Sequence, residues 1–194
     1  MDRLMKLLLD QNYSEDEASI IIYGWRKLVL FLINIIISLA IGIVFGCGIE
    51  VAIFVVLFLL IRLFAGGYHM NKLWKCEILS TLIIVAVSIF FLVYSKYDNI
   101  EWVLHILTLI SVLIHYLCAP QDTPNKRLFV AEKKRFKMIS SILVSVYVIA
   151  YIILSVNDGL IYKLRGTITM ALCVSALSLI ENIFAERRSL HEDK

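Results

Sequence analysis

Six long apolar blocks constrain this chain more than any other feature of its sequence. They cover residues 28–46, 49–64, 79–95, 102–117, 139–156 and 167–180. A helix needs about 20 mainly apolar residues to cross a hydrocarbon core roughly 30 Å thick, and most of these blocks approach that length. The second block is the least regular, since it carries Glu50 near one end and Arg62 near the other. The sequence therefore predicts an all-α, polytopic integral membrane protein with six transmembrane helices.

The composition agrees with that prediction. Of the 194 residues 60% are hydrophobic and 18% are charged, whereas a soluble domain is about half apolar and a quarter charged. The first two blocks are too long for one span together, and residues 46–48 (Gly-Cys-Gly) suit the turn of a tight hairpin. The four cysteines are widely spaced, which argues against a disulfide framework and a zinc site. No cleavable signal peptide is expected at the start.

The distribution of lysine and arginine predicts the orientation. With six spans, both termini and the second and fourth loops lie on one side of the membrane. Of the 19 Lys and Arg residues, only Lys96, Lys163 and Arg165 fall on the other side. Cations are enriched in cytoplasmic loops, so we expect the N- and C-termini and residues 62–78 and 119–138 to be cytoplasmic.

The N-terminal segment is polar enough to remain outside the bilayer core. Leu4, Leu7 and Leu8 recur at helical spacing, which predicts an amphipathic interfacial helix, although a simple lead-in to the first span is the alternative. Ser14 and Glu17 form a capping-box pattern that predicts a second helix starting at Glu15. We treat the chain as a single membrane domain, 1–194, divided into 1–27 (amphipathic segment), 28–61 (hairpin), 62–78 (catalytic loop), 79–118 (spans three and four), 119–138 (basic loop), 139–183 (spans five and six) and 184–194 (tail).

The polar stretch at residues 62–77 carries the candidate chemistry. It contains the only Gly-Gly pair, Gly66-Gly67, and then a histidine and a cysteine, His69 and Cys76. Cysteine reacts as the thiolate, so a catalytic cysteine needs a base or positive surroundings. His69 is the candidate base, while Lys72 and Lys75 supply positive charge and Asn71 is a candidate helix cap. A chance juxtaposition of the two residues is the competing interpretation.

Helix geometry sets a condition on this pair. Seven residues of straight helix rise about 10.5 Å, whereas proton transfer needs contact at roughly 3 Å. His69 and Cys76 therefore cannot work together on one unbroken helix. A backbone break at Gly66-Gly67 permits a fold-back that brings them together.

Other polar residues inside or beside the apolar blocks have a structural interpretation as well as a functional one. Asn34 and Ser38 share one helical face and are expected to pack, with hydrogen bonds to a neighbouring helix. His105 and His115 do not share a face, and their separation makes a weak case for a direct role. The basic loop is either an anchor to anionic membrane lipid or a dock for an acidic peptide. Its cations are Lys126, Arg127, Lys133, Lys134, Arg135 and Lys137.

The motif Arg62, Gly67, His69 and Cys76 resembles, in order and spacing, the core motif of the accessory gene regulator B (AgrB-like) family. Residues 119–126 (Ala-Pro, four residues, Asn-Lys) resemble a second family feature. A proline usually follows that Asn-Lys pair, and here Arg127 stands in its place, so the resemblance does not fix the conformation of this loop. The resemblance covers essentially the whole chain. It implies a bacterial integral-membrane cysteine endopeptidase of the plasma membrane.

The resemblance also implies a reaction. Members cut a small quorum-sensing propeptide (AgrD-like) near its acidic C-terminal tail. Here Cys76 would be the nucleophile and His69 the general base. The resulting thioester would then be attacked by a Cys or Ser of the peptide, which closes a thiolactone or lactone ring without ATP. The resemblance further suggests a homodimer, and neither a cofactor, a metal nor a nucleic-acid partner is expected.

Two other functional classes compete with this prediction. A small transporter or a peptide-binding scaffold without catalysis would use the loop residues to line a pathway or a surface. Transporters commonly show paired repeats or Gly/Pro-interrupted spans, and the chain shows neither. A membrane metalloprotease lacks the required HExxH-type ligand set here.

Overall fold

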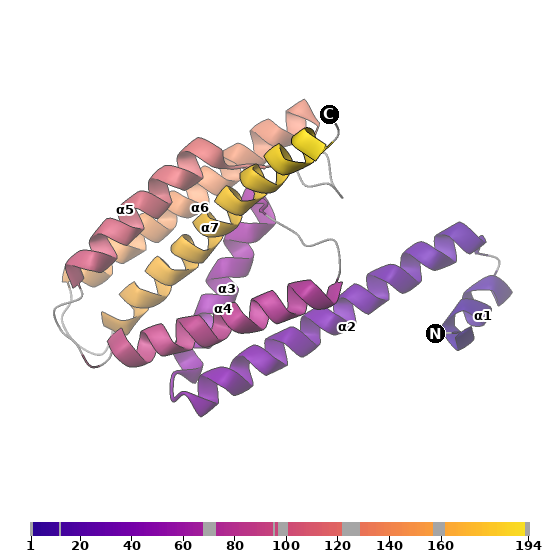
Figure 1. The fold of residues 1–194 in the computed structure, drawn as a ribbon, viewed down its shortest axis with the longest axis horizontal. Helices are drawn as coiled ribbons and strands as arrows, with labels where there is room; N and C mark the ends of the chain where they lie inside the picture. Colours follow the sequence, from indigo (N-terminus) through magenta and orange to yellow (C-terminus); the bar gives the residue numbers. More distant parts are fainter. Residues whose placement is uncertain are drawn as a thin grey trace.

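The computed structural model describes residues 2–11, 13–67, 73–94, 96, 101–121, 129–156 and 162–192. These residues form helices and no strand (Figure 1). The helices are α1 (Asp2–Asp10), α2 (Glu15–Val44), α3 (Gly48–Ala65), α4 (Leu73–Tyr94), α5 (Glu101–Cys118), α6 (Val130–Val156) and α7 (Tyr162–Glu192). Six of them, α2 to α7, are long and apolar enough to cross a membrane. The predicted all-α fold with six spans is confirmed.

Local sequence explains where α2 begins and ends. The Ser14 hydroxyl accepts a hydrogen bond from the Glu17 amide, and the Glu17 carboxylate accepts one from the Ser14 amide. This is the predicted capping box. At the other end Gly46 has a φ of 70°, and α3 starts two residues later. The hairpin is tight, because a Cβ on Gly42 would lie 2.9 Å from the Cβ of Val51.

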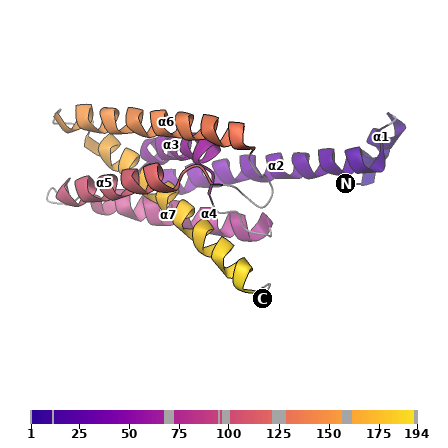
Figure 2. The same ribbon diagram turned by 90° about the horizontal axis from the view of Figure 1, so that it is seen from above.

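The helices divide into a bundle and a pair. Helix α7 packs extensively on α3 and on α5, and it is the most buried of the six spans. Helix α6 covers α3, and α2 pairs with α4 beside the bundle (Figures 1 and 2). The N-terminal half of α2 extends beyond the bundle and carries α1 at its end. Helix α1 is amphipathic, and its position on a membrane surface stays a prediction.

Helix α7 differs from the sequence-based expectation at its C-terminus. We expected the sixth span to end at Glu181 and Asn182 and to be followed by a short tail. The helix instead continues to Glu192. Residues 183–192 contain neither Gly nor Pro and are rich in Ala, Glu, Arg and Leu, all of which favour a helix. The end of the apolar block therefore does not end the helix.

Candidate active site

Cys76 lies in the first turn of α4, which starts at Leu73. Its side chain is half-buried, and the thiol is free. Its neighbour Lys75 is exposed, with Nζ 5.6 Å from the centre of the Trp74 ring. We call this end of the molecule, where α3 ends and α4 begins, the cation-rich end. The cysteine is therefore held on a regular helix at the edge of a membrane span.

Arg62 is the cation that acts on Cys76 from another helix. It lies in the last turn of α3, and its Nη1 donates a hydrogen bond of 3.3 Å to Ser178 Oγ on α7. The guanidinium carbon lies 5.5 Å from the centre of the Phe58 ring. The positive charge of Arg62 interacts through space with the Cys76 sulfur. Positive surroundings favour the thiolate over the thiol, so this contact suits a nucleophilic cysteine.

The glycine pair holds the chain close to two other segments. Gly66 and Gly67 have φ values of 77° and 135°, a region that side-chain-bearing residues rarely adopt. A Cβ on Gly66 would lie 2.6 Å from the Gln121 carbonyl oxygen, and one on Gly67 would lie 2.5 Å from Ser178 Oγ. The Gln121 amide also donates to the Ala65 carbonyl at 3.1 Å. The break that the sequence predicted is therefore also a point of close packing.

Glu77, the residue after Cys76, is bound by α2. The side-chain amide Nδ2 of Asn34 donates a hydrogen bond of 2.9 Å to Glu77 Oε2. Ser38, one turn further along α2, donates instead to the Asn34 carbonyl within its own helix. The prediction that this polar face bonds to a neighbouring helix is therefore confirmed for Asn34 and is wrong for Ser38.

The basic start of α6 lies beside this end of α3. The Phe136 ring packs edge-on against Phe64, at a centroid distance of 6.1 Å. The Phe129 amide donates to the Glu132 carboxylate at 3.1 Å, which closes the first turn of α6. The four predicted cations of this helix are exposed: Lys133, Lys134, Arg135 and Lys137. The Phe64–Phe136 contact thus joins the basic surface to the helix that carries Arg62.

Five of the predicted site residues lie outside the described residues: His69, Asn71, Lys72, Lys126 and Arg127. The fold-back that brings His69 to Cys76 therefore stays a prediction. What the structure brings together is Arg62, Gly66, Gly67 and Cys76, with Gln121, Ser178 and the Asn34–Glu77 pair around them. In the described part of the chain, no three His, Cys, Asp or Glu side chains gather to hold a metal ion.

Comparison with known proteins decides the family. The chain matches the family model "Accessory gene regulator B" over residues 1–183. The chain belongs to the accessory gene regulator B family. Members of this family take part in the processing of a quorum-sensing propeptide. With its six apolar helices, this AgrB-family chain is a multi-pass membrane protein.

Individual relatives agree with the family match. The chain is 33% identical over 164 residues to "Putative AgrB-like protein 2" of Clostridium perfringens (strain 13 / Type A), which covers 79% of this chain and 76% of that protein. A second relative, from C. perfringens strain SM101, is 32% identical over 174 residues, or 82% of this chain and 80% of the relative. Protein FsrB of Enterococcus faecalis (strain ATCC 47077 / OG1RF) is 26% identical over 129 residues, 63% of this chain and 51% of FsrB. No solved structure gives a significant match.

The two histidines of α5 are packing residues in this AgrB-family fold. His115 is buried, with Nδ1 2.7 Å from the Ser111 carbonyl and Nε2 3.0 Å from Ser175 Oγ on α7. His105 Nδ1 lies 2.8 Å from the Tyr151 hydroxyl on α6. They face different helices, as their spacing predicted. Both rings therefore join α5 to its neighbours.

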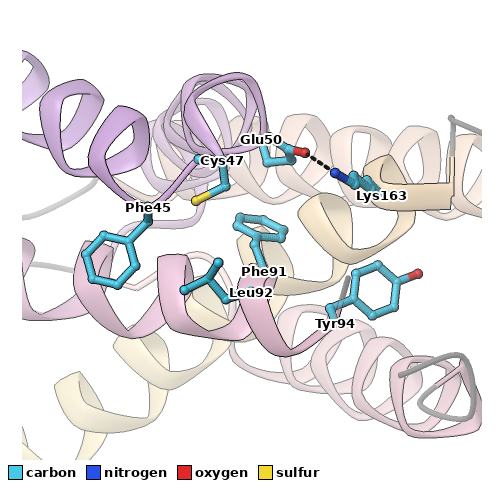
Figure 3. Close-up of a pocket in the computed structure, with 8 residues that line it drawn as sticks. Phe45, Cys47, Glu50, Phe91, Leu92, Tyr94 and Lys163 are labelled. Carbon is cyan, nitrogen blue, oxygen red and sulfur yellow. Dashed lines mark ion pairs between the residues drawn. The ribbon is translucent and has the colours of Figure 1, made fainter. Parts of the chain in front are cut away.

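A small pocket lies at the other end of the bundle, far from Cys76 along α4 (Figure 3). It is lined by Cys47, by aromatic side chains that include Phe91 and Tyr94, and by the Glu50–Lys163 ion pair, whose atoms are 3.3 Å apart. None of the predicted site residues lines it. The candidate active site of this AgrB-family protein is therefore an open membrane-edge site instead of this pocket.

Sequence reasoning missed Gln121 and Ser178. Both contact the glycine pair, yet one follows α5 and the other lies within α7, far along the chain from Gly66. The Gly-Gly pair did signal a close approach of the backbone. The sequence contains no comparable signal for the identity of the approaching residues, because Gln121 and Ser178 resemble ordinary loop and span residues.

Proposed function

We propose that this AgrB-family protein is a membrane cysteine endopeptidase that cleaves the C-terminal tail of an AgrD-like quorum-sensing propeptide and cyclises the remainder. One observation carries the proposal. A half-buried free cysteine, Cys76, lies at the start of a membrane helix where the charge of Arg62 acts on its sulfur. The basic start of α6 lies on the same side of the fold and offers a surface to an acidic tail.

The reaction has two steps. His69 takes the thiol proton, and the Cys76 thiolate attacks the scissile carbonyl. The tetrahedral intermediate collapses as His69 returns the proton to the leaving amine, which releases the tail and leaves a thioester on Cys76. A Cys or Ser side chain of the peptide then attacks the thioester carbonyl, forms the (thio)lactone ring and regenerates the enzyme thiol. The thioester retains the acyl activation, and restricted access of water near the bilayer favours cyclisation over hydrolysis.

Arg62 supports the thiolate in this scheme, and the glycine pair shapes the loop that carries His69. We place the active site on the cytoplasmic side of the bacterial plasma membrane, because lysine and arginine concentrate at that end. The cations of the basic loop, including Lys126 and Arg127, hold the acidic tail and contact anionic lipid. A homodimer is proposed on the family resemblance alone.

Co-expression with the propeptide encoded beside the gene tests the proposal. We expect Cys76→Ala and His69→Ala to abolish cleavage of the tail. Cys118→Ala is the matched control, since Cys118 is also free and half-buried and ends a span, α5, whose following residues contact Gly66. This control should process the peptide normally. Undiminished cleavage in either Cys76→Ala or His69→Ala would reject the catalytic assignment and favour a transporter or a binding scaffold.

A further inference from the structure

The hydrogen bond between Asn34 and Glu77 joins α2 to the residue that follows the nucleophile. Both side chains are half-buried, and the 2.9 Å bond lies between two helices that pack along each other. The bond is charge-assisted if Glu77 is ionised, and such bonds hold a carboxylate more firmly than neutral ones do. The direction of the Glu77 carboxylate is therefore set by α2.

That direction matters because of the neighbouring charges. A carboxylate close to a cysteine disfavours the thiolate, whereas a guanidinium favours it. Glu77 is adjacent to Cys76 in sequence, while Arg62 reaches the same sulfur from α3. A Glu77 side chain released from Asn34 has two unfavourable options. It approaches the thiolate, or it pairs with Arg62 and weakens the support that Arg62 gives to the sulfur.

We propose that Asn34 is a positioning residue for the nucleophile: it holds the Glu77 carboxylate against α2 and leaves the Arg62 charge to Cys76. The proposal rests on the proposed function only in taking Cys76 as the nucleophile. The reactivity of the Cys76 thiol is measurable without any peptide, so the two proposals fail separately.

The other charged groups near this end do not replace this arrangement. On the described parts of the helices that pack against α4, the ionisable side chains nearest to this end are few. They are Lys27 on α2, Arg62 on α3, Lys75 and Glu77 on α4 itself, and Glu181 on α7. Lys27 lies about two turns before Asn34, and Glu181 is exposed and therefore screened by solvent. Glu77 is the carboxylate whose position Asn34 controls.

A different account of the bond is that it simply joins two helices. Polar side chains inside membrane spans commonly do so and add modestly to stability. That account predicts a change in thermal stability when Asn34 is replaced and no change in the reactivity of Cys76. The two accounts therefore differ in a measurement that folding alone does not move.

The test is the pH profile of alkylation at Cys76 in the full-length protein, purified in detergent, with iodoacetamide as the reagent. Mass spectrometry of the peptide that contains Cys76 separates its signal from those of the other three cysteines. We expect Asn34→Leu to move the midpoint to higher pH and to slow alkylation at pH 7 by about threefold, the change that half a pH unit produces. Glu77→Gln should not slow it, and Asn34→Leu combined with Glu77→Gln should match Glu77→Gln alone. Asn34→Gln should restore part of the rate.

Ser38→Ala is the matched control, because Ser38 lies one turn away on the same face and bonds only within α2. It should leave the profile unchanged. Thermal unfolding of each variant identifies loss of the fold. The proposal is overturned if folded Asn34→Leu keeps the wild-type profile, or if its effect persists when Glu77 is Gln. A normal alkylation result with no peptide processing would instead count against the proposed function.

Discussion

Two cysteines close to the ends of membrane helices show how much the surroundings decide. Cys47 lies in the turn between α2 and α3, is 4% exposed and faces the pocket at the end away from Cys76 (Figure 3). Burial raises the pKa of the Cys47 thiol, and the nearby Glu50 carboxylate acts in the same direction. Cys76 is half-buried, and the charge acting on it from α3 is the cation of Arg62.

The difference teaches that the two ends of the bundle have different tasks. At the end that holds Cys47, Lys163 pairs with Glu50, and Arg165 pairs with Glu101 at 2.6 Å. These carboxylates neutralise the cations and fasten the helices. At the cation-rich end Arg62 bonds to a neutral hydroxyl and acts on a thiol. One end uses its charges for structure, and the other has an arrangement suited to chemistry.

The largest effect is expected from the buried ion pair. Glu101→Gln should lower the free energy of unfolding by about 1.5–3 kcal/mol, because Arg165 is buried and loses a charge-assisted hydrogen bond. Thermal unfolding in detergent measures the loss. Glu50→Gln is the matched comparison and should cost less than about 1 kcal/mol, since its partner Lys163 is 42% exposed. An equal loss in both variants would contradict the assignment of Arg165 as the main fastening.

Arg62 gives the next largest effect, on reactivity. Arg62→Met should slow alkylation of Cys76 and processing of the peptide by about ten- to thirtyfold, because the thiolate loses a nearby positive charge. Arg62→Lys should retain part of both rates. Alkylation of Cys47 serves as the internal control and should not change. Wild-type reactivity of Cys76 in Arg62→Met would mean that Arg62 only fastens α3 to Ser178.

A direct comparison of the two thiols follows. In the wild-type protein we expect Cys47 to react with iodoacetamide about tenfold more slowly than Cys76 at pH 7, because it is buried and its pKa is raised. Its thiolate forms only above the ordinary value of 9.0, so its reaction should accelerate most at high pH. Mass spectrometry of the two cysteine-containing peptides gives both rates. Equal rates at pH 7 would remove the contrast between the ends.

The basic start of α6 should give the smallest effect. Replacing Lys133, Lys134 and Arg135 with Gln should weaken processing by about three- to fivefold at low salt, and less at high salt, because the exposed charges are screened. Replacing the exposed cations Arg26 and Lys27 of α2 is the control and should have no such effect. Unchanged binding of an acidic-tailed peptide to the triple variant would leave the basic helix as a lipid anchor only.

The sequence predicted those parts of the fold that depend on local patterns. Apolar length identified the six spans, the Ser14–Glu17 capping box identified the start of α2, and the glycines identified the hairpin turn. Two candidate residues, Arg62 and Cys76, do interact across helices. The partners that surround them were not predictable, because Asn34–Glu77 and Arg62–Ser178 join residues far apart in the chain. The C-terminal length of α7 was missed because helix propensity continues after the apolar block ends.

The packing at the glycine pair has a consequence for mutational scanning. An alanine at Gly67 meets Ser178 Oγ at 2.5 Å, and an alanine at Gly66 meets a main-chain oxygen of Gln121 at 2.6 Å. A side-chain atom can rotate away, but a main-chain oxygen cannot do so without moving its segment. A scan would therefore score Gly66 at least as severely as a true catalytic position, although it carries no functional group. Sensitivity to substitution along this loop reports available space as much as it reports chemistry.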